Sequence, residues 1–441
     1  LAKTEHNEVA PSQHELAPIF SVANIATDHN QLTMEIMQKV ASRHGLVCLL
    51  AEKPFAGVNG SGKHNNWSMS TTHENLLDPG DTPMENLQFL VFLAAVIKAV
   101  DEYADLLRTS VATPGNDHRL GANEAPPAVI SIFLGDELTA VLDAIETDTP
   151  YSGTEKTVLK LGVHVLPKFT RDTTDRNRTS PFAFTGNKFE FRMVGSSDSI
   201  ACANIMLNAA MAETLKEFAD RLEGVSDFES ALHDLIKETI KAHKRIIFNG
   251  NGYDDAWIKE ATEKRGLLNL RTTPDALATV LEKKNVEMLT SLKIFSEAEI
   301  RSRYEICLEN YCKTVNIEGL TMVDMARKEI LPAVEAYLGD LSGTVAAKTA
   351  AVPGLACKYE KDLISKLSKL ADEISDAASS LDTTLIRLKA IPDVTDAAYV
   401  IRDVVLQKMA ELRVVCDEAE SITADKYWPF PTYGDLLFGV R

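Results

Sequence analysis

The sequence contains no apolar run long enough to cross a bilayer, and it has no excess of basic residues. Its longest apolar stretch, Phe89 to Ile97, is nine residues long, whereas a membrane-spanning helix needs about twenty. The 46 Lys and Arg residues are outnumbered by 64 Asp and Glu, which gives a net charge of −18. A surface of this sign repels nucleic acid and anionic lipid. We therefore expect neither a nucleic-acid partner nor a membrane partner.

Closely spaced cysteine pairs are also missing. The six cysteines are scattered, and none forms a CxxC pair or a metal-finger spacing. We therefore expect reduced thiols and a cytoplasmic protein. The sequence opens Leu1-Ala2-Lys3-Thr4, with neither a methionine nor a signal peptide. We expect it to be part of a longer protein, which leaves organelle targeting open.

The length and composition are typical of a globular protein of two or three domains, with 45% hydrophobic and 25% charged residues over 441 positions. Nine of the ten histidines lie before position 234, in a half rich in Asn, Thr, Ser, Gly and Pro. From about residue 200 onward, Ala, Leu, Glu and Lys dominate with a helical period. The two halves are therefore expected to differ in architecture.

The first half predicts short strands interleaved with helices. Glu8 to Phe20 is predicted to form a strand, a turn at Pro11-Ser12-Gln13 and a second strand. A helix is predicted from an Asp28 N-cap to a Gly45 C-cap, with Leu32, Ile36, Met37 and Val40 as its apolar stripe. The remaining expected elements are a buried strand over 46–50, a helix over 85–108, and strands over 129–134 and 188–193.

The second half predicts helices throughout. One helix is expected over 197–222. Two further apolar patterns, over 363–381 and 397–412, predict an antiparallel helical hairpin across Pro392. A joint is expected within 339–354, although much of that stretch fits a helix equally well.

One motif is misleading. Gly57 to Lys63 matches GxxxxGK, but His64 stands where a P-loop has Ser or Thr, and the residues that follow are typical of a strand and not of a helix. A phosphate-binding P-loop is therefore not favoured.

Several side chains suited to metals and anions lie in extended segments. Glu8 and Glu15 flank a turn, so a hairpin can bring both carboxylates to one side. Glu190 and Arg192 share the polar side of an alternating strand, and His64 follows a Gly-rich loop. Carboxylates with one histidine suit Mg²⁺ or Mn²⁺, and arginines suit carboxylate and phosphate. Taken singly, each could also be an ordinary surface or ion-pair residue.

Five motifs resemble motifs of the glutamine synthetase family, and they occur along the chain in the same order as in that family. They are the EVAxxQxE run at Glu8–Glu15, the KP…NGSGxH loop at Lys53–His64, the EAP flap at Glu124–Pro126, the RNR segment at Arg176–Arg178 and the ExR strand at Glu190–Arg192. The amino-acid sequences of segments 26–31, 177–188 and 427–433 resemble those of the type III subfamily of glutamine synthetases. The resemblance covers the whole chain, and its specific motifs concentrate in 1–195.

The resemblance implies ATP-dependent ligation of ammonia to L-glutamate through γ-glutamyl phosphate, giving L-glutamine for nitrogen assimilation. It implies two divalent ions, Mg²⁺ or Mn²⁺, with ATP as co-substrate. The residues that match the family's site are Glu8 and Glu15 (first metal), His64 and Glu190 (second metal), Asn59, Gly60, Arg119 and Arg192 (substrate), Ser68, Arg178 and Lys188 (ATP), and Glu124 and Arg178 (catalysis).

The resemblance also implies a fold and an assembly. The expected fold is α/β, with a curved, mostly antiparallel sheet covered by outer helices and followed by an all-helical C-terminal region. We expect a catalytic domain over 1–215, its helical continuation over 216–338 and a C-terminal helical region over 339–441. The family implies a double-ring dodecamer, so a homo-oligomer is expected.

The chain departs from the family pattern at several places. Asn66 replaces a second histidine and Ala183 replaces an arginine, which puts nucleotide contacts at these two places in doubt. Lys188 keeps the charge of the family's usual basic residue but lacks its planar fork. The family's Glu-x-Glu strand and N-terminal β-grasp domain have no counterpart, because the only such pairs, Glu297/Glu299 and Glu418/Glu420, lie in helical stretches. The chain alone is therefore expected to be inactive or nearly so. The alternatives are a non-catalytic relative and a γ-glutamyl ligase that acts on amines.

Overall fold

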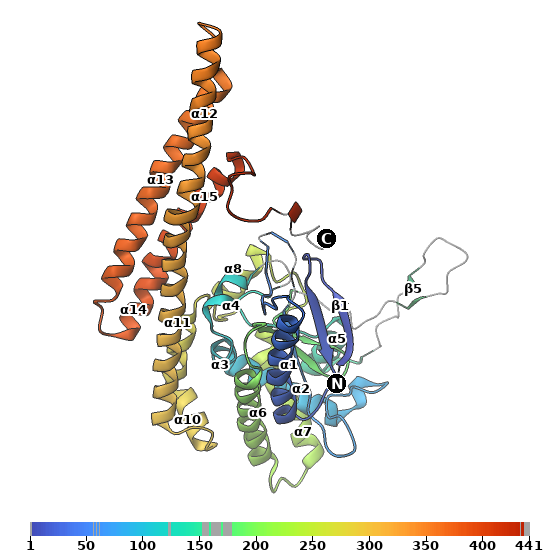
Figure 1. Cartoon of the computed structure of the whole chain (residues 1–441). Helices are drawn as coiled ribbons and strands as arrows, with labels where there is room; N and C mark the ends of the chain where they lie inside the picture. Colours follow the sequence, from blue (N-terminus) through green and yellow to red (C-terminus); the bar gives the residue numbers. More distant parts are fainter. Residues whose placement is uncertain are drawn as a thin grey trace. The chain divides into compact units, whose positions relative to one another are not determined.

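The computed structural model describes residues 2–55, 57–58, 60, 62–121, 125–151, 158–159, 169–170, 179–432 and 434–435. The chain divides into two compact units, Leu1–Ser302 and Arg303–Arg441, and Figure 1 shows the elements of each. The expected three-part division at 215/216 and 338/339 stays a prediction. Over the described residues, every helix is too short or too polar to span a membrane.

The first unit opens with a hairpin and a helix. Strands β1 (Ala2–Asn7) and β2 (His14–Pro18) pair antiparallel. The predicted turn and second strand are confirmed, but the first strand lies ahead of its predicted place at residues 8–10, which are not in a strand. Helix α1 (Ala23–Arg43) begins ahead of the predicted Asp28 cap, so that N-cap was wrong. Gly45 follows with a φ of 70°, the left-handed conformation expected of a helix-ending glycine.

The predicted buried strand over 46–50 is wrong. These residues have no regular structure, and Leu46, Val47 and Leu49 are 66%, 84% and 79% exposed. An apolar run becomes a buried strand only where a neighbouring strand satisfies its backbone and a second layer covers it. Among the described residues, no strand pairs with this segment.

A four-stranded sheet forms the centre of the first unit, with the order β3-β8-β7-β4. Its strands are β3 (Lys63–Trp67), β8 (Phe189–Val194), β7 (Phe182–Phe184) and β4 (Ile132–Phe133). All neighbours are antiparallel except β4 and β7, which are parallel. The predicted α/β fold with a mostly antiparallel sheet is confirmed, although the strand expected over 129–134 is shorter.

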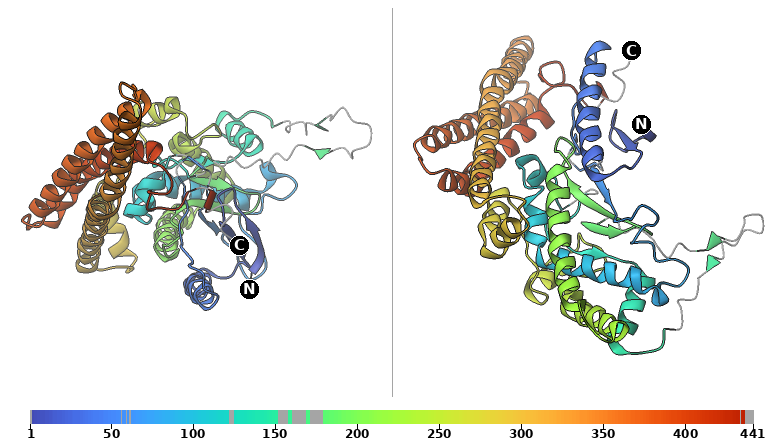
Figure 2. Two further views of the ribbon diagram at one scale, coloured as in Figure 1. Left: turned by 45° about the horizontal axis from the view of Figure 1, so that its top comes forward. Right: turned by 90° about the horizontal axis from the view of Figure 1, so that it is seen from below.

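One face of this sheet is apolar and packs against helices. The ring of Phe182 stacks on that of Phe189 with centroids 4.7 Å apart, and Phe184 lies 6.0 Å from Phe89 of α2 (Leu87–Glu102). Helix α6 (Ala201–Leu222) accepts a 2.8 Å hydrogen bond from the Trp67 indole, and Figure 2 shows this helix beside the sheet. The opposite face is left for the polar residues of β8.

The predicted helix over 85–108 is two helices, because the chain turns at Tyr103 between α2 and α3 (Ala104–Thr109). The predicted helix over 197–222 is confirmed as α6. The other elements of the first unit are η1 (Pro83–Glu85), α4 (Pro114–Arg119), α5 (Asp136–Thr147), β5 (Val158–Leu159), β6 (Phe169–Thr170), α7 (Phe228–His243), η2 (Lys244–Ile246), α8 (Asp255–Glu263), α9 (Thr273–Ala278), η3 (Thr279–Leu281) and α10 (Lys283–Ser291).

The second unit is made of long helices, as predicted. Helix α11 (Glu297–Met325) enters it from the first unit and continues through the π-helical turn η4 (Ala326–Ile330) into α12 (Leu331–Ala351). Helix α13 (Lys358–Leu388) then returns, followed by α14 (Val394–Val400), the π-helical turn η5 (Ile401–Val405) and α15 (Leu406–Ile422). Both Glu-x-Glu pairs lie in helices, α11 and α15. Most of the 339–354 stretch is helical and belongs to α12.

The predicted helical hairpin across Pro392 is confirmed, because α13 packs along α15. Its buried stripe on α13 follows a three- and four-residue spacing that includes Leu367, Leu370, Ile374 and Leu381. Ala378 is buried in this stripe, whereas its neighbour Ala377 is half-buried.

Candidate active site

The N-terminal hairpin brings two predicted metal ligands together. The backbone N–H of Glu8 donates to the Gln13 carbonyl at 2.9 Å, which extends the hairpin past the end of β1. The ligand atoms of Glu8, Glu15 and His6 all lie within 4.8 Å of one another. The carboxylates therefore lie on one side of the hairpin, as its turn predicted. His6 was not among the predicted site residues, although its place two residues before Glu8 could have suggested it.

Gln13 ties this hairpin to the segment that precedes the Gly-rich loop. Its amide nitrogen donates to the carbonyls of Ala51 and Glu52, at 3.0 and 3.2 Å. A Cβ on Gly60 would collide with that same Glu52 carbonyl. The hairpin turn and the Gly-rich loop therefore meet at Glu52, and the predicted glycine is required there by close packing.

The polar side of β8 gathers three further predicted residues. The Nδ1 atom of His64, on β3, lies 3.6 Å from Oε1 of Glu190. The Nη1 atom of Arg192 lies 3.9 Å from Oε2 of the same carboxylate. The side chains of Glu190 and Arg192 are 5% and 4% exposed, so their charges are held out of water. Buried charges persist only where they are paired or bind a charged ligand, which makes this pair the strongest candidate for chemistry.

Arg119 joins this group from the end of α4. Its Nε donates to Oδ1 of Asn116 at 2.9 Å, and its Nη2 donates to the Arg192 carbonyl at 3.1 Å. The Asn116 amide in turn donates to the carbonyls of Val111 and Met193, both at 2.7 Å. Asn116 is thus fully bonded and fixes the orientation of Arg119. Burial lowers the pKa of the Arg119 guanidinium, while the Glu52 and Asp198 carboxylates oppose that shift.

Gly62 allows Arg119 to reach the Gly-rich loop. A Cβ at Gly62 would lie 2.5 Å from Nη1 of Arg119, closer than any side chain tolerates. The loop that resembled a P-loop is followed by β3 and not by a helix, and its glycines admit an arginine. The prediction that a strand follows this loop, and that it is therefore not a P-loop, is confirmed.

The two described residues predicted to contact ATP lie at one end of the sheet. Ser68 follows β3, and its hydroxyl donates to the Asn187 carbonyl at 3.1 Å. Lys188 follows that residue, and its Nζ lies 3.4 Å from Oδ1 of Asn187. Ser68 is exposed and Lys188 is half-buried, so both are accessible to a ligand. Their nucleotide role stays a prediction.

Three predicted site residues lie outside the described residues, namely Asn59, Glu124 and Arg178. At the places where the sequence departs from the family pattern, Asn66 is exposed on β3 and Ala183 is fully buried in β7. Neither supplies a positive charge to the polar face of the sheet.

A half-buried cluster beside the Gly-rich loop was not predicted from the sequence. Nζ of Lys63 donates to the Asp198 carbonyl and to Oδ1 of Asn30, the latter at 3.2 Å. Burial lowers the pKa of Lys63 from 10.5 to about 8, opposed by the carboxylates of Asp198 and Glu52. Burial, together with the Glu52 carboxylate, raises the pKa of Asp198. Residue 198 is far from residues 52 and 63 in the sequence, and no spacing pattern connects it with them.

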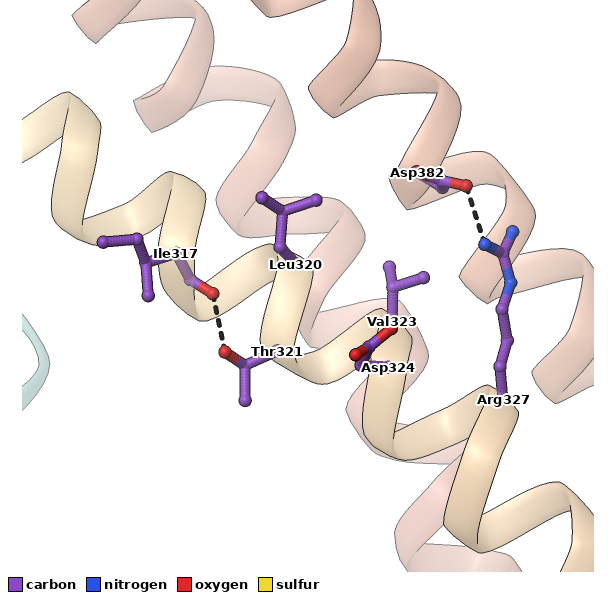
Figure 3. Close-up of a pocket in the computed structure, with 7 residues that line it drawn as sticks. All are labelled: Ile317, Leu320, Thr321, Val323, Asp324, Arg327 and Asp382. Carbon is purple, nitrogen blue, oxygen red and sulfur yellow. Dashed lines mark hydrogen bonds and ion pairs between the residues drawn. The ribbon is translucent and has the colours of Figure 1, made fainter.

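The second unit carries a groove of about 400 Å³, shown in Figure 3, that has different chemistry. Its polar groups already have partners, since Arg327 pairs with Asp382 at 2.7 Å and the Thr321 hydroxyl donates to the Ile317 carbonyl at 2.8 Å. Its remaining lining is mainly aliphatic. The groove contains none of the predicted site residues, so the first unit is the candidate active site.

The donor set in the first unit fits hard divalent cations. Glu8 with Glu15, and Glu190 with His64, supply carboxylate oxygens and one imidazole nitrogen, the ligands that suit Mg²⁺ and Mn²⁺. The arginines beside Glu190 suit anionic substrate groups. The described residues therefore provide two places for a cation and one group of cationic side chains.

Two family models match separate parts of the chain. The model "Glutamine synthetase, catalytic domain" matches residues 2–128, and the model "Glutamine synthetase C-terminal domain" matches residues 231–349. The first match contains the hairpin that carries Glu8 and Glu15, together with β3 and Arg119. The chain belongs to the glutamine synthetase family.

Curated relatives match it along its whole length. It is 50% identical over 446 residues to a glutamine synthetase of Butyrivibrio fibrisolvens, covering 100% of this chain and 63% of the relative. It is 45% identical over 444 residues to the "Type-3 glutamine synthetase" of Dictyostelium discoideum, covering 99% and 60%. A Bacteroides fragilis glutamine synthetase is 43% identical over 453 residues, covering 99% and 61%.

The chain thus spans about three fifths of the length of these relatives. A solved structure titled "Apo GmaS without ligand" is similar at 18% identity and a TM-score of 0.33, covering 62% of this chain and 55% of that one. The similarity to the type-3 glutamine synthetase of Dictyostelium discoideum agrees with the resemblance of three sequence segments to the type III subfamily.

Proposed function

We propose that the protein containing this chain ligates ammonia to L-glutamate in an ATP-dependent reaction that gives L-glutamine. One observation carries the proposal: His64, Glu190 and Arg192, which come from two separate motifs, meet on the polar face of one sheet, and Arg119 of α4 donates to the backbone carbonyl of Arg192. High identity to glutamine synthetases over the whole chain supports the same reaction.

The residues of this face would divide the work by charge. Glu190 and His64 would hold one divalent ion, and Glu8 and Glu15 the other. When bound, these ions neutralise the phosphates of ATP and the phosphoryl group in transfer. Arg119, fixed by Asn116, would hold the carboxylate of glutamate. Arg192 would stabilise the negative charge that develops as the γ-carboxylate of glutamate attacks the terminal phosphate.

The remaining predicted residues complete the proposal. Ser68, Lys188 and Arg178 would contact ATP, and Asn59 and Gly60 would contact glutamate. Glu124 would close over the acyl phosphate, exclude water and accept a proton from ammonium, so that neutral ammonia attacks. Magnesium or manganese and ATP are thus the proposed cofactor and co-substrate.

We also propose a cytoplasmic homo-oligomer. All six cysteines, each within the described residues, are free thiols, which suits a reducing compartment. The predicted apolar stripe of α1 is not buried within this chain, since Leu32, Ile36 and Val40 are 54%, 48% and 42% exposed. Further polypeptide covering such a stripe would remove apolar surface from water.

The test is the release of ADP that depends on glutamate and ammonium, measured on the full-length protein that contains this chain. Glu190→Gln keeps the shape of the side chain but removes the charge, and it should lower the rate by about 100-fold or more, since even indirect disturbance of a metal site costs roughly 10–100-fold. Glu238→Gln, in an exposed pair with Arg221, is the matched control and should keep the parent rate.

Two results would contradict the proposal. A folded full-length protein that releases no ADP would favour the non-catalytic alternative. Turnover with a primary amine but none with ammonium would favour the amine-specific ligase.

A further inference from the structure

The two faces of the N-terminal hairpin are built differently. Side chains alternate along a strand, so His6 and Glu8 lie on one side of β1. The register pairs His6 directly with Glu15 of β2, which brings that carboxylate to the same side. Nδ1 of His6 lies 3.2 Å from Oε1 of Glu8. All three ligand atoms lie within 4.8 Å of one another.

The opposite face has a histidine and a carboxylate at the same separation but no third ligand. Nδ1 of His14 lies 3.2 Å from Oε1 of Glu5, and the two side chains are 57% and 58% exposed. His6 is 50% exposed, while its partner Glu8 is only 14% exposed. Among the described residues, the His6 face alone forms a group of three ligands. An exposed ion pair is enough to explain the position of His14 beside Glu5. It does not explain why two carboxylates, those of Glu8 and Glu15, lie close to His6.

We propose that His6 is a third protein ligand of the metal held by Glu8 and Glu15, and that it makes this hairpin site favour Mn²⁺ over Mg²⁺. This inference rests on the proposed function, which assigns a metal to the two carboxylates. Mg²⁺ takes oxygen ligands and keeps several waters, whereas an imidazole nitrogen raises affinity for transition metals. One histidine among carboxylates is therefore a means of metal selection.

His6 could instead only orient Glu8 through a hydrogen bond. A residue that orients a carboxylate would help both cations about equally, because the carboxylate binds both. A nitrogen ligand would help Mn²⁺ more than Mg²⁺. The ratio of the two affinities therefore separates the two roles, and it does not depend on catalytic activity.

The experiment titrates the 441-residue chain with Mn²⁺, measures free Mn²⁺ by electron paramagnetic resonance and repeats the titration in competing Mg²⁺. His6→Ala should lower Mn²⁺ affinity by about tenfold or more, the least that disturbance of a metal site typically costs, and should lower Mg²⁺ affinity less. His14→Ala is the matched control from the other face and should leave both affinities unchanged. His6→Asn, which can still donate a hydrogen bond to Glu8, should behave like His6→Ala.

A spectroscopic measurement identifies the ligand directly. In a His64→Ala background, which removes the other predicted histidine ligand, pulsed electron paramagnetic resonance should detect imidazole nitrogen coupled to bound Mn²⁺. That coupling should disappear with His6→Ala and persist with His14→Ala.

Several outcomes would overturn the inference. They are equal losses of Mn²⁺ and Mg²⁺ affinity in His6→Ala, recovery by His6→Asn, unchanged binding, and absence of nitrogen coupling. Loss of Mn²⁺ binding in Glu8→Gln with no change in His6→Ala would overturn this inference alone and leave the proposed metal site standing. Unchanged binding in both Glu8→Gln and Glu15→Gln, or no Mn²⁺ binding by the unsubstituted chain, would overturn both.

Discussion

The two units of the chain bury different kinds of side chains. The first unit buries many charged and amide groups, including Arg108, Arg119, Glu190 and Arg192, whereas Thr423 is the one polar residue that is as deeply buried among the described residues of the second. Buried charges need partners and contribute little net stability, while buried apolar groups stabilise directly. The first unit is therefore built to hold chemistry, and the second to hold helices together.

The sharpest test of this comparison breaks a buried ion pair in the first unit. Arg108 is 1% exposed, and its Nη2 lies 2.7 Å from Oδ1 of Asp117. Arg108→Met should lower the free energy of unfolding by about 3–5 kcal/mol, because it leaves the Asp117 carboxylate buried without its cation. Urea unfolding followed by tryptophan fluorescence measures the change.

The matched control is a variant that removes an exposed ion pair instead of a buried one. Arg301→Met removes an exposed helical pair with Glu297 and should cost no more than about 0.5 kcal/mol. Equal losses in the two variants would show that the buried pair is no more important than a surface pair. Burial raises the pKa of Asp117 even with Arg108 in place, so the variant should also raise that pKa further.

The second unit should respond most strongly to loss of apolar volume. Leu381 lies in the buried stripe of α13 and is fully buried. Leu381→Ala should cost about 2–5 kcal/mol through lost burial and the cavity it leaves. Ile386→Ala on the same helix, at a site that is 61% exposed, should change stability by no more than about 0.5 kcal/mol. Similar losses from both would mean that the stripe is not the seam of the bundle.

The smallest expected effect is a pH dependence from Lys63. Its pKa is about 8 in the folded protein and 10.5 ordinarily. Between these values the unfolded lysine keeps its proton and the folded one has lost it, so stability rises with pH. The stability of the parent chain relative to Lys63→Met should therefore increase from pH 8 to 10.5 and stay level below pH 8. Urea unfolding at a series of pH values tests this, and a falling difference would contradict it.

Local patterns predicted much of the fold. The alternation on β8, the helical stripe of α13 and the turn at Pro11-Ser12 each depend on neighbours in the sequence. Leu46 to Leu50 was mispredicted because an apolar run signals burial only if another strand arrives to cover it. The break at Tyr103 was missed because the apolar pattern continues across it.

The sequence predicted the candidate site only as a set of separate motifs, without the distances between them in the folded chain. The motifs located Glu190 and His64, but their 3.6 Å separation depends on the pairing of β3 with β8. The roles of Asn116 and of the cluster around Lys63 were not predicted, because Asn116 is held by the carbonyl of Met193 and Lys63 by that of Asp198, and both contacts join segments far apart in the sequence. His6 was overlooked because a strand's register is not visible in its composition.

The π-helical turns at Ala326–Ile330 and Ile401–Val405 have a consequence for the helices that follow them. Both turns contact α13. Each holds one residue more than an α-helical turn, so every later side chain is rotated by about 100° around the helix axis. Deleting a single residue from 326–330 would restore a regular helix, yet it would turn the whole of α12 to present a different face to α13.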